Sequence, residues 1–297
     1  MTMCYVCPHR CGVDRPETLN SEGCFGSCRC GLAPIVARAA LHMWEEPVIS
    51  GTRGSGAVFF SGCNLHCVYC QNYEISSGGK GKEITVERLR EIYFELIKKG
   101  AHNINLVTPT HFTEAVLKSL AEPLPVPVVY NTSGFETVST LRRLKGKVQI
   151  YLPDLKYADD VAAVKYSNAP FYFRVATEAI KEMYSQVGPY KINKDGIMES
   201  GVIIRHLILP GMVDNTKRVI DWVAANFKPR QVLFSLMHQY VPCGRASEYP
   251  EINRKVTDAE YNELKKYLMR SPIEDGFIQE ASSACEDFIP AFDFTGV

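Results

Sequence analysis

The sequence has no excess of charge of either sign and no long apolar run. Its 297 residues carry 33 lysines and arginines against 33 aspartates and glutamates, so the formal net charge is zero. Balanced charge removes the usual electrostatic basis for binding duplex nucleic acid or an anionic membrane. No stretch approaches the roughly 18 apolar residues of a membrane span, and no basic region followed by an apolar stretch marks a secretion signal. We therefore expect a cytoplasmic protein with neither nucleic acid nor a membrane as its partner.

Several catalytic motifs are also missing. The sequence contains no Gly-x-Ser-x-Gly, His-Glu-x-x-His or Walker pattern. Hydrophobic residues make up 46% and charged residues 22%, which is ordinary for a globular protein and excludes disordered and fibrous classes. The length fits one large α/β domain as well as two smaller ones.

Cysteine, by contrast, is abundant. The chain has eleven, at Cys4, Cys7, Cys11, Cys24, Cys28, Cys30, Cys63, Cys67, Cys70, Cys243 and Cys285. An odd number without an export signal argues against a disulfide framework, because cytosolic thiols are kept reduced. Thiols clustered in the first 70 residues indicate bound zinc or iron–sulfur iron. We interpret Cys243 and Cys285 as small buried side chains.

The first 50 residues differ from the rest. Residues 1–50 hold six cysteines and little periodic pattern, so we expect a mostly irregular segment organised by metal. Residues 51–297 alternate between short apolar runs and amphipathic stretches. The predicted strands are Ala57–Phe60, Asn103–Val107, Val126–Tyr130, Val148–Leu152, Val202–Leu209 and Val232–Met237. The predicted helices are Val86–Ile97 capped by Thr85, Thr113–Leu120, Thr137–Leu144, 159–167, 176–187, 215–226 and one that runs from a capping box at Thr257 to Met269.

Strands that alternate with helices imply right-handed crossovers and a mostly parallel sheet. Six such units predict an α/β fold of the partial parallel (β/α)6 barrel type, with a doubly wound open sheet as the alternative. In either fold the carboxyl ends of the strands carry the functional site.

The central motif follows the first of these strands. Cys63, Cys67 and Cys70 have the spacing C-x3-C-x2-C. Three thiolates at this spacing suit one face of a 4Fe–4S cluster and leave the fourth iron without a protein ligand. That iron is open to a substrate or cofactor, unless His66 within the loop supplies a fourth ligand.

This motif, with Tyr69 in its aromatic position, resembles the signature of radical S-adenosylmethionine (SAM) enzymes. The resemblance implies that the open iron binds SAM and that the reduced cluster cleaves it to a 5′-deoxyadenosyl radical, which abstracts hydrogen from a substrate. It also implies an electron donor such as a flavodoxin or ferredoxin.

The wider sequence is similar to an uncharacterised group related to the pyruvate formate-lyase activating enzyme, an oxidoreductase. The similarity covers nearly the whole chain and is carried by the stretches 59–65, 70–76, 130–134, 151–157, 204–211 and 235–240. Each of these stretches closes a predicted strand or begins just after one, so their polar residues converge on one pocket.

The resemblance assigns roles at these strand ends. Asp154 and Lys156 contact SAM, unless they form only a structural ion pair. Asn131 and Ser133 lie near its adenosyl or ribose part, and Arg205 faces the methionine carboxylate or a neighbouring acid.

The sequence departs from the superfamily pattern at one place in this pocket, and the role of one histidine stays open. The superfamily often has Gly-Gly-Glu after the second strand, where this chain has Thr108 and Thr110 as alternative contacts for the SAM amino group. His238 lines the far wall, with a core or capping histidine as the other interpretation.

The N-terminal cysteines resemble the four-cysteine module of the same group. The matching positions are Cys4, Cys7, Cys11 and Cys28, and either Cys24 or Cys30 is an alternative to Cys28. Four thiolates suit zinc or a fully ligated auxiliary 4Fe–4S cluster, and we favour the cluster.

The sequence therefore predicts a radical SAM enzyme. The resemblance suggests a glycine of a partner enzyme as the target, with a small molecule or peptide as the alternative substrate. The rival hypothesis is a non-catalytic iron–sulfur electron-transfer or metal-binding protein, in which both centres are fully ligated.

Overall fold

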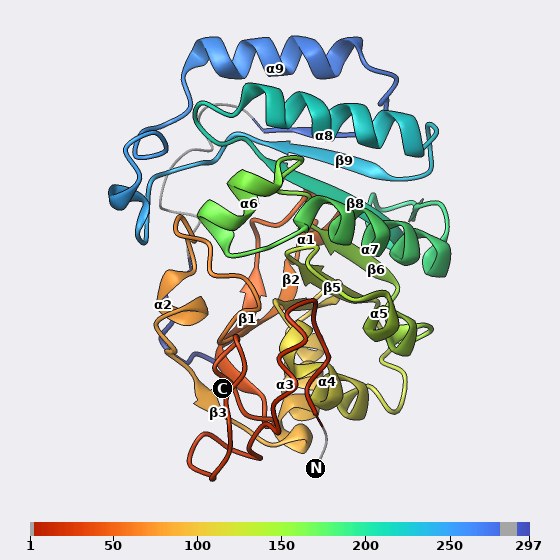
Figure 1. Ribbon diagram of the computed structural model, residues 1–297. Helices are drawn as coiled ribbons and strands as arrows, with labels where there is room; N and C mark the ends of the chain where they lie inside the picture. Colours follow the sequence, from red (N-terminus) through yellow and green to blue (C-terminus); the bar gives the residue numbers. More distant parts are fainter. Residues whose placement is uncertain (1–2, 280–289) are drawn as a thin grey trace.

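The computed structural model describes residues 3–279 and 290–297 of the chain (Figure 1). Its elements, in chain order, are β1 (Ile35–His42), α1 (Pro47–Ser50), β2 (Ser55–Phe60), α2 (Tyr73–Ser76), β3 (Lys82–Glu83), α3 (Val86–Lys98), β4 (Ile104–Val107), η1 (Thr110–Phe112), α4 (Thr113–Ser119), β5 (Val128–Thr132), α5 (Val138–Leu144), β6 (Ile150–Pro153), α6 (Asp160–Ser167), α7 (Tyr172–Val187), β7 (Lys191–Ile192), β8 (Met198–Leu207), α8 (Val213–Asn226), β9 (Leu233–Met237), η2 (Ala246–Glu248), α9 (Asp258–Arg270) and β10 (Gly276–Ile278).

One mostly parallel sheet organises the fold. The six predicted strands are β2, β4, β5, β6, β8 and β9, and each pairs in parallel with the next in this order. β10 extends the sheet in parallel beyond β9, whereas β1 pairs antiparallel with β2 on the other side. The sheet path runs from β10 at one end to β3 at the other, so the described sheet is open.

The two faces of this sheet differ in how helices cover them. This difference distinguishes a partial barrel from a doubly wound sheet. Along β4, Ile104 and Leu106 belong to the main apolar cluster, which also contains the buried residues of α3, α4, α5, α7, α8 and α9. Val107 belongs to a small separate cluster, as expected because successive strand residues point to opposite faces. A doubly wound sheet would carry helices on both faces. The long helices here cover one face, so the prediction of a partial barrel is confirmed.

The inner face holds the short helix α1. Ile49 of α1 is fully buried and packs with Val129, Leu152 and Ile203 of the strands. The Asn103 side chain donates to the Ile49 carbonyl at 2.8 Å, and the Ser55 hydroxyl donates to Asn103 at 2.6 Å. α1 therefore fills the interior of the barrel.

Most predicted elements form, with shifted ends. Thr85 caps α3 and Thr257 forms the predicted capping box at α9. β5 starts two residues later than predicted, because Pro127 lacks the N–H that a central strand needs, and it continues to Thr132, which pairs with Pro153. β8 starts earlier than predicted because Met198 pairs with the unpredicted strand β7.

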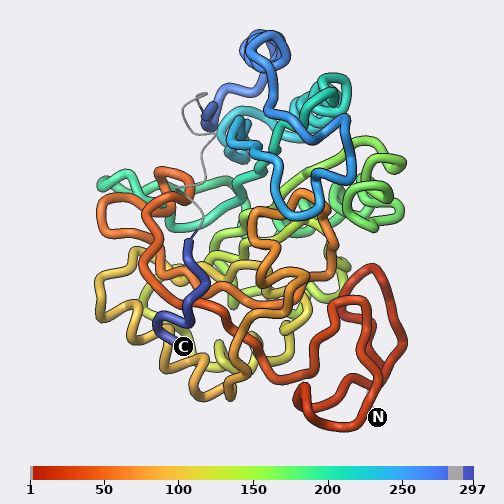
Figure 2. Tube along the Cα trace, turned by 90° about the vertical axis from the view of Figure 1, so that its left-hand side faces the viewer, coloured from red at the N-terminus to blue at the C-terminus, as the bar shows by residue number. Residues whose placement is uncertain are grey.

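β1 was not predicted from the sequence. It lies within the first 50 residues, where the cysteines dominate the pattern, yet it pairs with β2 over its length. Residues 3–34 before it contain no helix or regular strand and pack as loops beside the sheet (Figure 2). The side chain of Arg15 is buried and donates to the carbonyls of Cys30, Gly31 and His111, which ties these loops to the barrel.

Across residues 3–279 and 290–297, the helices are all too short or too polar to cross a membrane.

Candidate radical SAM site

A cavity of about 230 Å³ opens at the carboxyl ends of the parallel strands. The sequence-predicted residues that line it are Cys63, Cys67, Tyr69, Cys70, Thr108, Asn131, Ser133, Asp154, Lys156 and Arg205. They come from the ends of β2, β4, β5, β6 and β8. Convergence of separate strand ends on one cavity is the arrangement that parallel α/β folds use for their active sites.

The cysteine loop begins directly after β2. Gly62 precedes it with a φ of +77°, and a Cβ atom at Gly62 would collide with the Cys30 sulfur. Glycine is therefore required here for both the backbone conformation and the close packing of the N-terminal loops.

Each sulfur of this loop accepts a hydrogen bond. The backbone N–H of Leu65 donates to Cys63 Sγ at 3.3 Å, and the hydroxyl of Ser76 donates to Cys70 Sγ at 3.3 Å. The hydroxyl of Ser167 donates to Cys67 Sγ at 3.0 Å. A neutral thiol is a weak acceptor, so donors aimed at all three sulfurs fit thiolates that ligate iron.

Burial of these thiols disfavours their thiolate form unless a cation lies nearby. Burial is the main cause that raises the pKa of Cys63 and raises that of Cys67 to about 11, and Lys156 opposes both shifts. Bound iron would supply the positive charge that stabilises the thiolates.

The number of thiols in this loop fits a 4Fe–4S cluster. Such a cluster binds each cysteine on a different iron atom, so three cysteines leave one of its four irons without a protein ligand. Cys63, Cys67 and Cys70 therefore fit a 4Fe–4S cluster with one iron open to SAM.

A network of largely buried charged side chains lines the same cavity. Lys156 Nζ donates to Asp154 Oδ2 at 2.6 Å, and Arg205 Nε donates to Asp154 Oδ1 at 2.9 Å. Arg205 also donates to Glu45 Oε2 at 3.1 Å and to Asn131 Oδ1 at 2.7 Å, and Asn131 donates to Glu45 Oε1 at 3.1 Å. Five polar side chains from four parts of the chain are thus locked together.

This network keeps Asp154 and Lys156 charged. Burial alone would raise the pKa of Asp154, but Arg205 and Lys156 outweigh it and hold that pKa below its ordinary value. Burial would lower the pKa of Lys156, but Asp154 outweighs it and keeps that pKa raised. A cavity with fixed positive and negative groups suits a zwitterionic ligand such as the methionine part of SAM.

Two acidic residues beside this network were missed by the sequence analysis. Glu45 and Glu46 lie between β1 and α1, and burial raises the pKa of Glu46 while Arg205 opposes that shift. Glu45 lines the cavity, as do His42 and Trp44, which is 64% exposed. The only signal in the sequence was an acidic pair before Pro47, and such a pair gives no indication of burial.

Thr108 stands where the superfamily often has glycine. It lines the cavity and has a φ of +60°, a conformation that β-branched residues rarely adopt. Its N–H donates to the Asn131 carbonyl at 2.8 Å, which holds the backbone in place. Strained backbone of this kind is concentrated at functional sites.

Two predicted site residues lie outside the cavity lining. Thr110 is buried in η1 and donates its hydroxyl to Glu136 Oε1. His238 packs against Tyr261 of α9, with ring centroids 4.2 Å apart. Met237 and Gln239 line the cavity, so alternation of side chains along the chain directs His238 away from it.

His66 does not compete as a fourth ligand in this arrangement. Its Nε2 lies 2.9 Å from the Ser27 carbonyl and 3.3 Å from the Ser27 hydroxyl, in the N-terminal loops. His9 Nε2 lies 2.7 Å from the Asn64 carbonyl and makes a second contact between the two cysteine-rich regions. Both histidines therefore bind the N-terminal loops to the cysteine loop.

The N-terminal cysteines lie in these loops. Burial is the main cause that raises the pKa of Cys7 to about 12, with contributions from charges at Glu136, Cys28 and Cys11. The thiol of Cys30 donates to Cys28 and so lowers the pKa of Cys28, with help from Arg15. Thiolate is therefore favoured at Cys28 over Cys30.

Three other cysteines are placed differently. Cys24 is exposed. Cys243 is half-buried and donates to the Tyr69 carbonyl at 3.2 Å, beside the cysteine loop. Cys285 lies outside the described residues.

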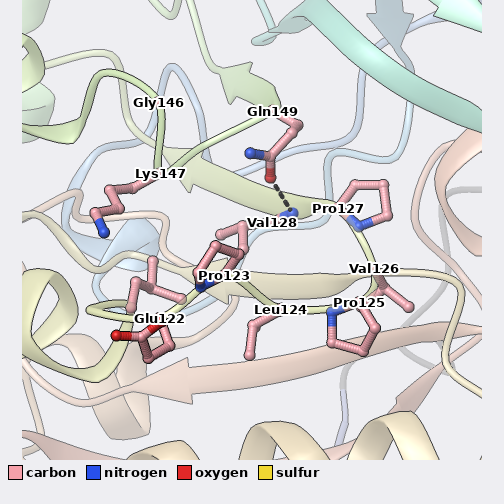
Figure 3. Close-up of a pocket in the computed structure, with 11 residues that line it drawn as sticks. Glu122, Pro123, Leu124, Pro125, Val126, Pro127, Val128, Gly146, Lys147 and Gln149 are labelled. Carbon is pink, nitrogen blue, oxygen red and sulfur yellow. Dashed lines mark hydrogen bonds between the residues drawn. The ribbon is translucent and has the colours of Figure 1, made fainter.

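Two other cavities lie away from the carboxyl ends of the parallel strands. One of about 250 Å³ lies at the opposite end of β5 and is lined by Pro123, Pro125 and Pro127 (Figure 3). There Gln149 Oε1 accepts a hydrogen bond from the N–H of Val128 at 2.9 Å. A larger cavity of about 630 Å³, lined by Cys4 among others, separates the N-terminal loops from α3, α4 and α5.

Comparison with known proteins agrees with this site. Residues 57–223 match the radical SAM superfamily. The chain is 33% identical to the uncharacterised protein MJ0674 of Methanocaldococcus jannaschii over 275 residues, which cover 89% of this chain and 73% of that one. The chain therefore belongs to the radical SAM superfamily, whose members use a 4Fe–4S cluster and SAM.

A solved structure of another protein shows the same fold. A mutant of spore photoproduct lyase aligns with a TM-score of 0.52 at 10% identity, covering 81% of each chain. Streptococcus suis SuiB bound to S-adenosylmethionine aligns with a TM-score of 0.48 at 13% identity, and the match covers 73% of this chain. The chain spans about half (48%) of the length of SuiB.

Proposed function

We propose that this enzyme cleaves SAM reductively at a cluster held by Cys63, Cys67 and Cys70, and that the resulting 5′-deoxyadenosyl radical abstracts hydrogen from a substrate at the cavity mouth. The single observation that carries the proposal is the shared cavity. The three cysteines line it together with Asp154, Lys156 and Arg205, which are joined by ion pairs. The cluster would supply the electron, and the network would hold the methionine part of SAM.

The target that we propose is a backbone glycine of a partner enzyme, as in the activating-enzyme group that the sequence resembles. The cavity of about 230 Å³ is smaller than the roughly 300–1,000 Å³ typical of sites that enclose a whole ligand. SAM would occupy most of this space, which favours a substrate that reaches in from the mouth. The exposed ring of Trp44 at this mouth suits contact with an incoming peptide segment.

We also propose a second metal centre at Cys4, Cys7, Cys11 and Cys28, and a small electron-transfer protein such as a flavodoxin or ferredoxin as the reductant. The centre is supported by the Ser27 N–H, which donates to Cys11 Sγ at 3.3 Å, and by the favoured thiolate at Cys28. An auxiliary 4Fe–4S cluster is our preferred occupant, since the neighbouring site already requires iron and sulfide.

The first test is electron paramagnetic resonance of anaerobically reconstituted, reduced protein with and without SAM. We expect a cluster signal that SAM perturbs and that a C63A/C67A/C70A variant lacks. Cys24→Ala, which changes an exposed thiol, is the matched control and should retain both signal and response. A signal that is indifferent to SAM would contradict the proposal and favour an electron-transfer protein.

The target class is tested by isotope transfer. The reduced enzyme is given SAM and a protein extract from cells grown on α-deuterated glycine, and mass spectrometry of 5′-deoxyadenosine follows the label. Deuterium in the nucleoside with the protein fraction, and none with the small-molecule filtrate, supports a glycine target. The reverse result would assign the activity to a small molecule.

A further inference from the structure

A chain of buried hydroxyl groups ends at one cysteine of the cluster motif. The Tyr69 and Tyr157 hydroxyls lie 2.6 Å apart, and the Tyr157 hydroxyl lies 2.7 Å from Ser167 Oγ. Ser167 in turn donates to Cys67 Sγ at 3.0 Å. Ser167 and Tyr157 are fully buried, and Tyr69 is 5% exposed. No sequence motif links these residues, since Ser167 lies 100 positions after Cys67.

The direction of this chain follows from chemistry. A cysteine that ligates iron is a thiolate and has no proton to give, so Ser167 must donate to Cys67. The Ser167 oxygen then accepts from Tyr157, and the Tyr157 oxygen accepts from Tyr69. Hydrogen bonds aligned in this way polarise one another, so the last donor is stronger than an isolated serine.

The position of Ser167 is fixed by the backbone as well. It is the last residue of α6, and its carbonyl accepts from the N–H of His66 at 3.4 Å. The neighbouring carbonyl of Tyr166 accepts from the N–H of Val68 at 2.9 Å. The end of α6 therefore accepts backbone hydrogen bonds from the residues on both sides of Cys67.

The donors to the other two sulfurs differ from Ser167. They are the N–H of Leu65, inside the loop itself, and the hydroxyl of Ser76, just after it, both at 3.3 Å. Ser167 is closer, comes from a separate helix and has a buried chain of donors behind it. Cys67 is thus the cysteine whose sulfur accepts a hydrogen bond from a donor that a distant part of the fold holds in place.

We propose that Ser167, supported by Tyr157 and Tyr69, is a positioning residue that raises the reduction potential of the cluster at Cys63, Cys67 and Cys70. A hydrogen bond to a ligand sulfur stabilises negative charge there, and the reduced cluster carries more of that charge than the oxidised one. This inference rests on the proposed function, because it assumes that the cluster is present.

The test is a redox titration of the reconstituted full-length enzyme, followed by electron paramagnetic resonance. Ser167→Ala removes the donor, and we expect the reduction equilibrium constant to fall about tenfold, which is about 59 mV for a one-electron couple. Tyr157→Phe keeps the Ser167 hydroxyl but removes the donor behind it, so we expect a smaller shift of the same sign.

Ser185→Ala is the matched control, because Ser185 is an exposed serine whose hydroxyl donates to the Glu182 carbonyl within α7. Iron and sulfide content and circular dichroism of each variant are compared with those of the wild type. If Ser167→Ala fails to hold a cluster, Tyr157→Phe decides the question.

An unchanged potential in Tyr157→Phe, or in cluster-loaded Ser167→Ala, would overturn the inference and leave the proposed function intact. A wild-type protein that assembles no SAM-responsive cluster would overturn the proposed function instead.

Discussion

At the scale of single residues, Glu136 is a carboxyl group that the fold buries. It is 1% exposed, and the hydroxyls of Thr110 and Thr132 both donate to its Oε1. Among the described residues its Oε2 has no hydrogen-bond partner. Burial raises its pKa from 4.5 to about 7, although the threonines oppose the shift. The folded state therefore binds a proton that the unfolded chain releases at lower pH.

We predict that Glu136→Gln removes a pH-dependent loss of stability. Between pH 4.5 and about 7 the folded state holds more protons than the unfolded state, so wild-type stability falls as the pH rises. At 1.36 kcal/mol per pKa unit the loss is about 3 kcal/mol above pH 7. The variant should match the wild type near pH 5 and exceed it by about this amount at pH 8, as measured by urea denaturation.

Glu114→Gln provides the control of opposite sign. Arg143 lowers the pKa of Glu114, so this carboxylate stabilises the fold above its unfolded pKa and its loss should slightly destabilise the protein at neutral pH. A stability difference between Glu136→Gln and wild type that stays constant from pH 5 to pH 8 would contradict the raised pKa.

At the scale of elements, the four-residue helix α1 fixes one wall of the site. It carries Ile49 into the apolar interior, and the two residues before it, Glu45 and Glu46, approach Arg205. The Ser50 hydroxyl donates to the His42 carbonyl at 3.1 Å and accepts from the Glu45 N–H at 3.0 Å. The turn from β1 into α1 is therefore held by its own residues.

We predict that Ile49→Ala destabilises the protein by about 2–5 kcal/mol, because it leaves a cavity among packed strand residues. Because α1 positions Glu45, SAM should also bind more weakly, as isothermal titration calorimetry would show. Val161→Ala is the control, since this side chain is 76% exposed, and it should stay within about 0.5 kcal/mol. A loss below about 1 kcal/mol in the Ile49 variant would show that α1 does not fill the barrel tightly.

At the scale of the whole molecule, the N-terminal loops and the barrel form two cysteine-rich regions in direct contact. His9 contacts Asn64, and His66 contacts Ser27. Cys30 packs against Gly62, the residue before the first cluster cysteine. A metal centre in the N-terminal loops would thus lie beside the SAM cluster rather than on a separate domain.

We predict that a C4S/C7S/C11S/C28S variant loses about four iron atoms per chain, the content of one 4Fe–4S cluster, and keeps the SAM-perturbed signal. Loss of one zinc instead would identify a structural metal. Metal analysis by mass spectrometry with inductively coupled plasma measures both, and Cys24→Ser should change neither. Full metal content in the quadruple variant would contradict a second centre at these residues.

The positions of several elements could be predicted because their signals are local. The spacing of apolar residues predicted six strands, and Thr85 and Thr257 marked the starts of α3 and α9. Several strand ends were wrong by two residues or more, at β2, β5, β6 and β8, because the pairing partner decides where a strand starts and stops. β1 was missed, since its pairing with β2 has no signature in a cysteine-rich segment.

The sequence by itself determined the cluster motif and the strand-end residues. Cys63, Cys67 and Cys70 lie within one loop, so their spacing alone predicts a cluster. Asp154 and Arg205 lie at the carboxyl ends of parallel strands, which predicts that they line one cavity, as they do. The tertiary structure alone brought Glu45 to Arg205 and Ser167 to Cys67, and it turned His238 towards Tyr261. Contacts between residues far apart in the chain depend on how strands and helices pack, and no local pattern of residues encodes that packing.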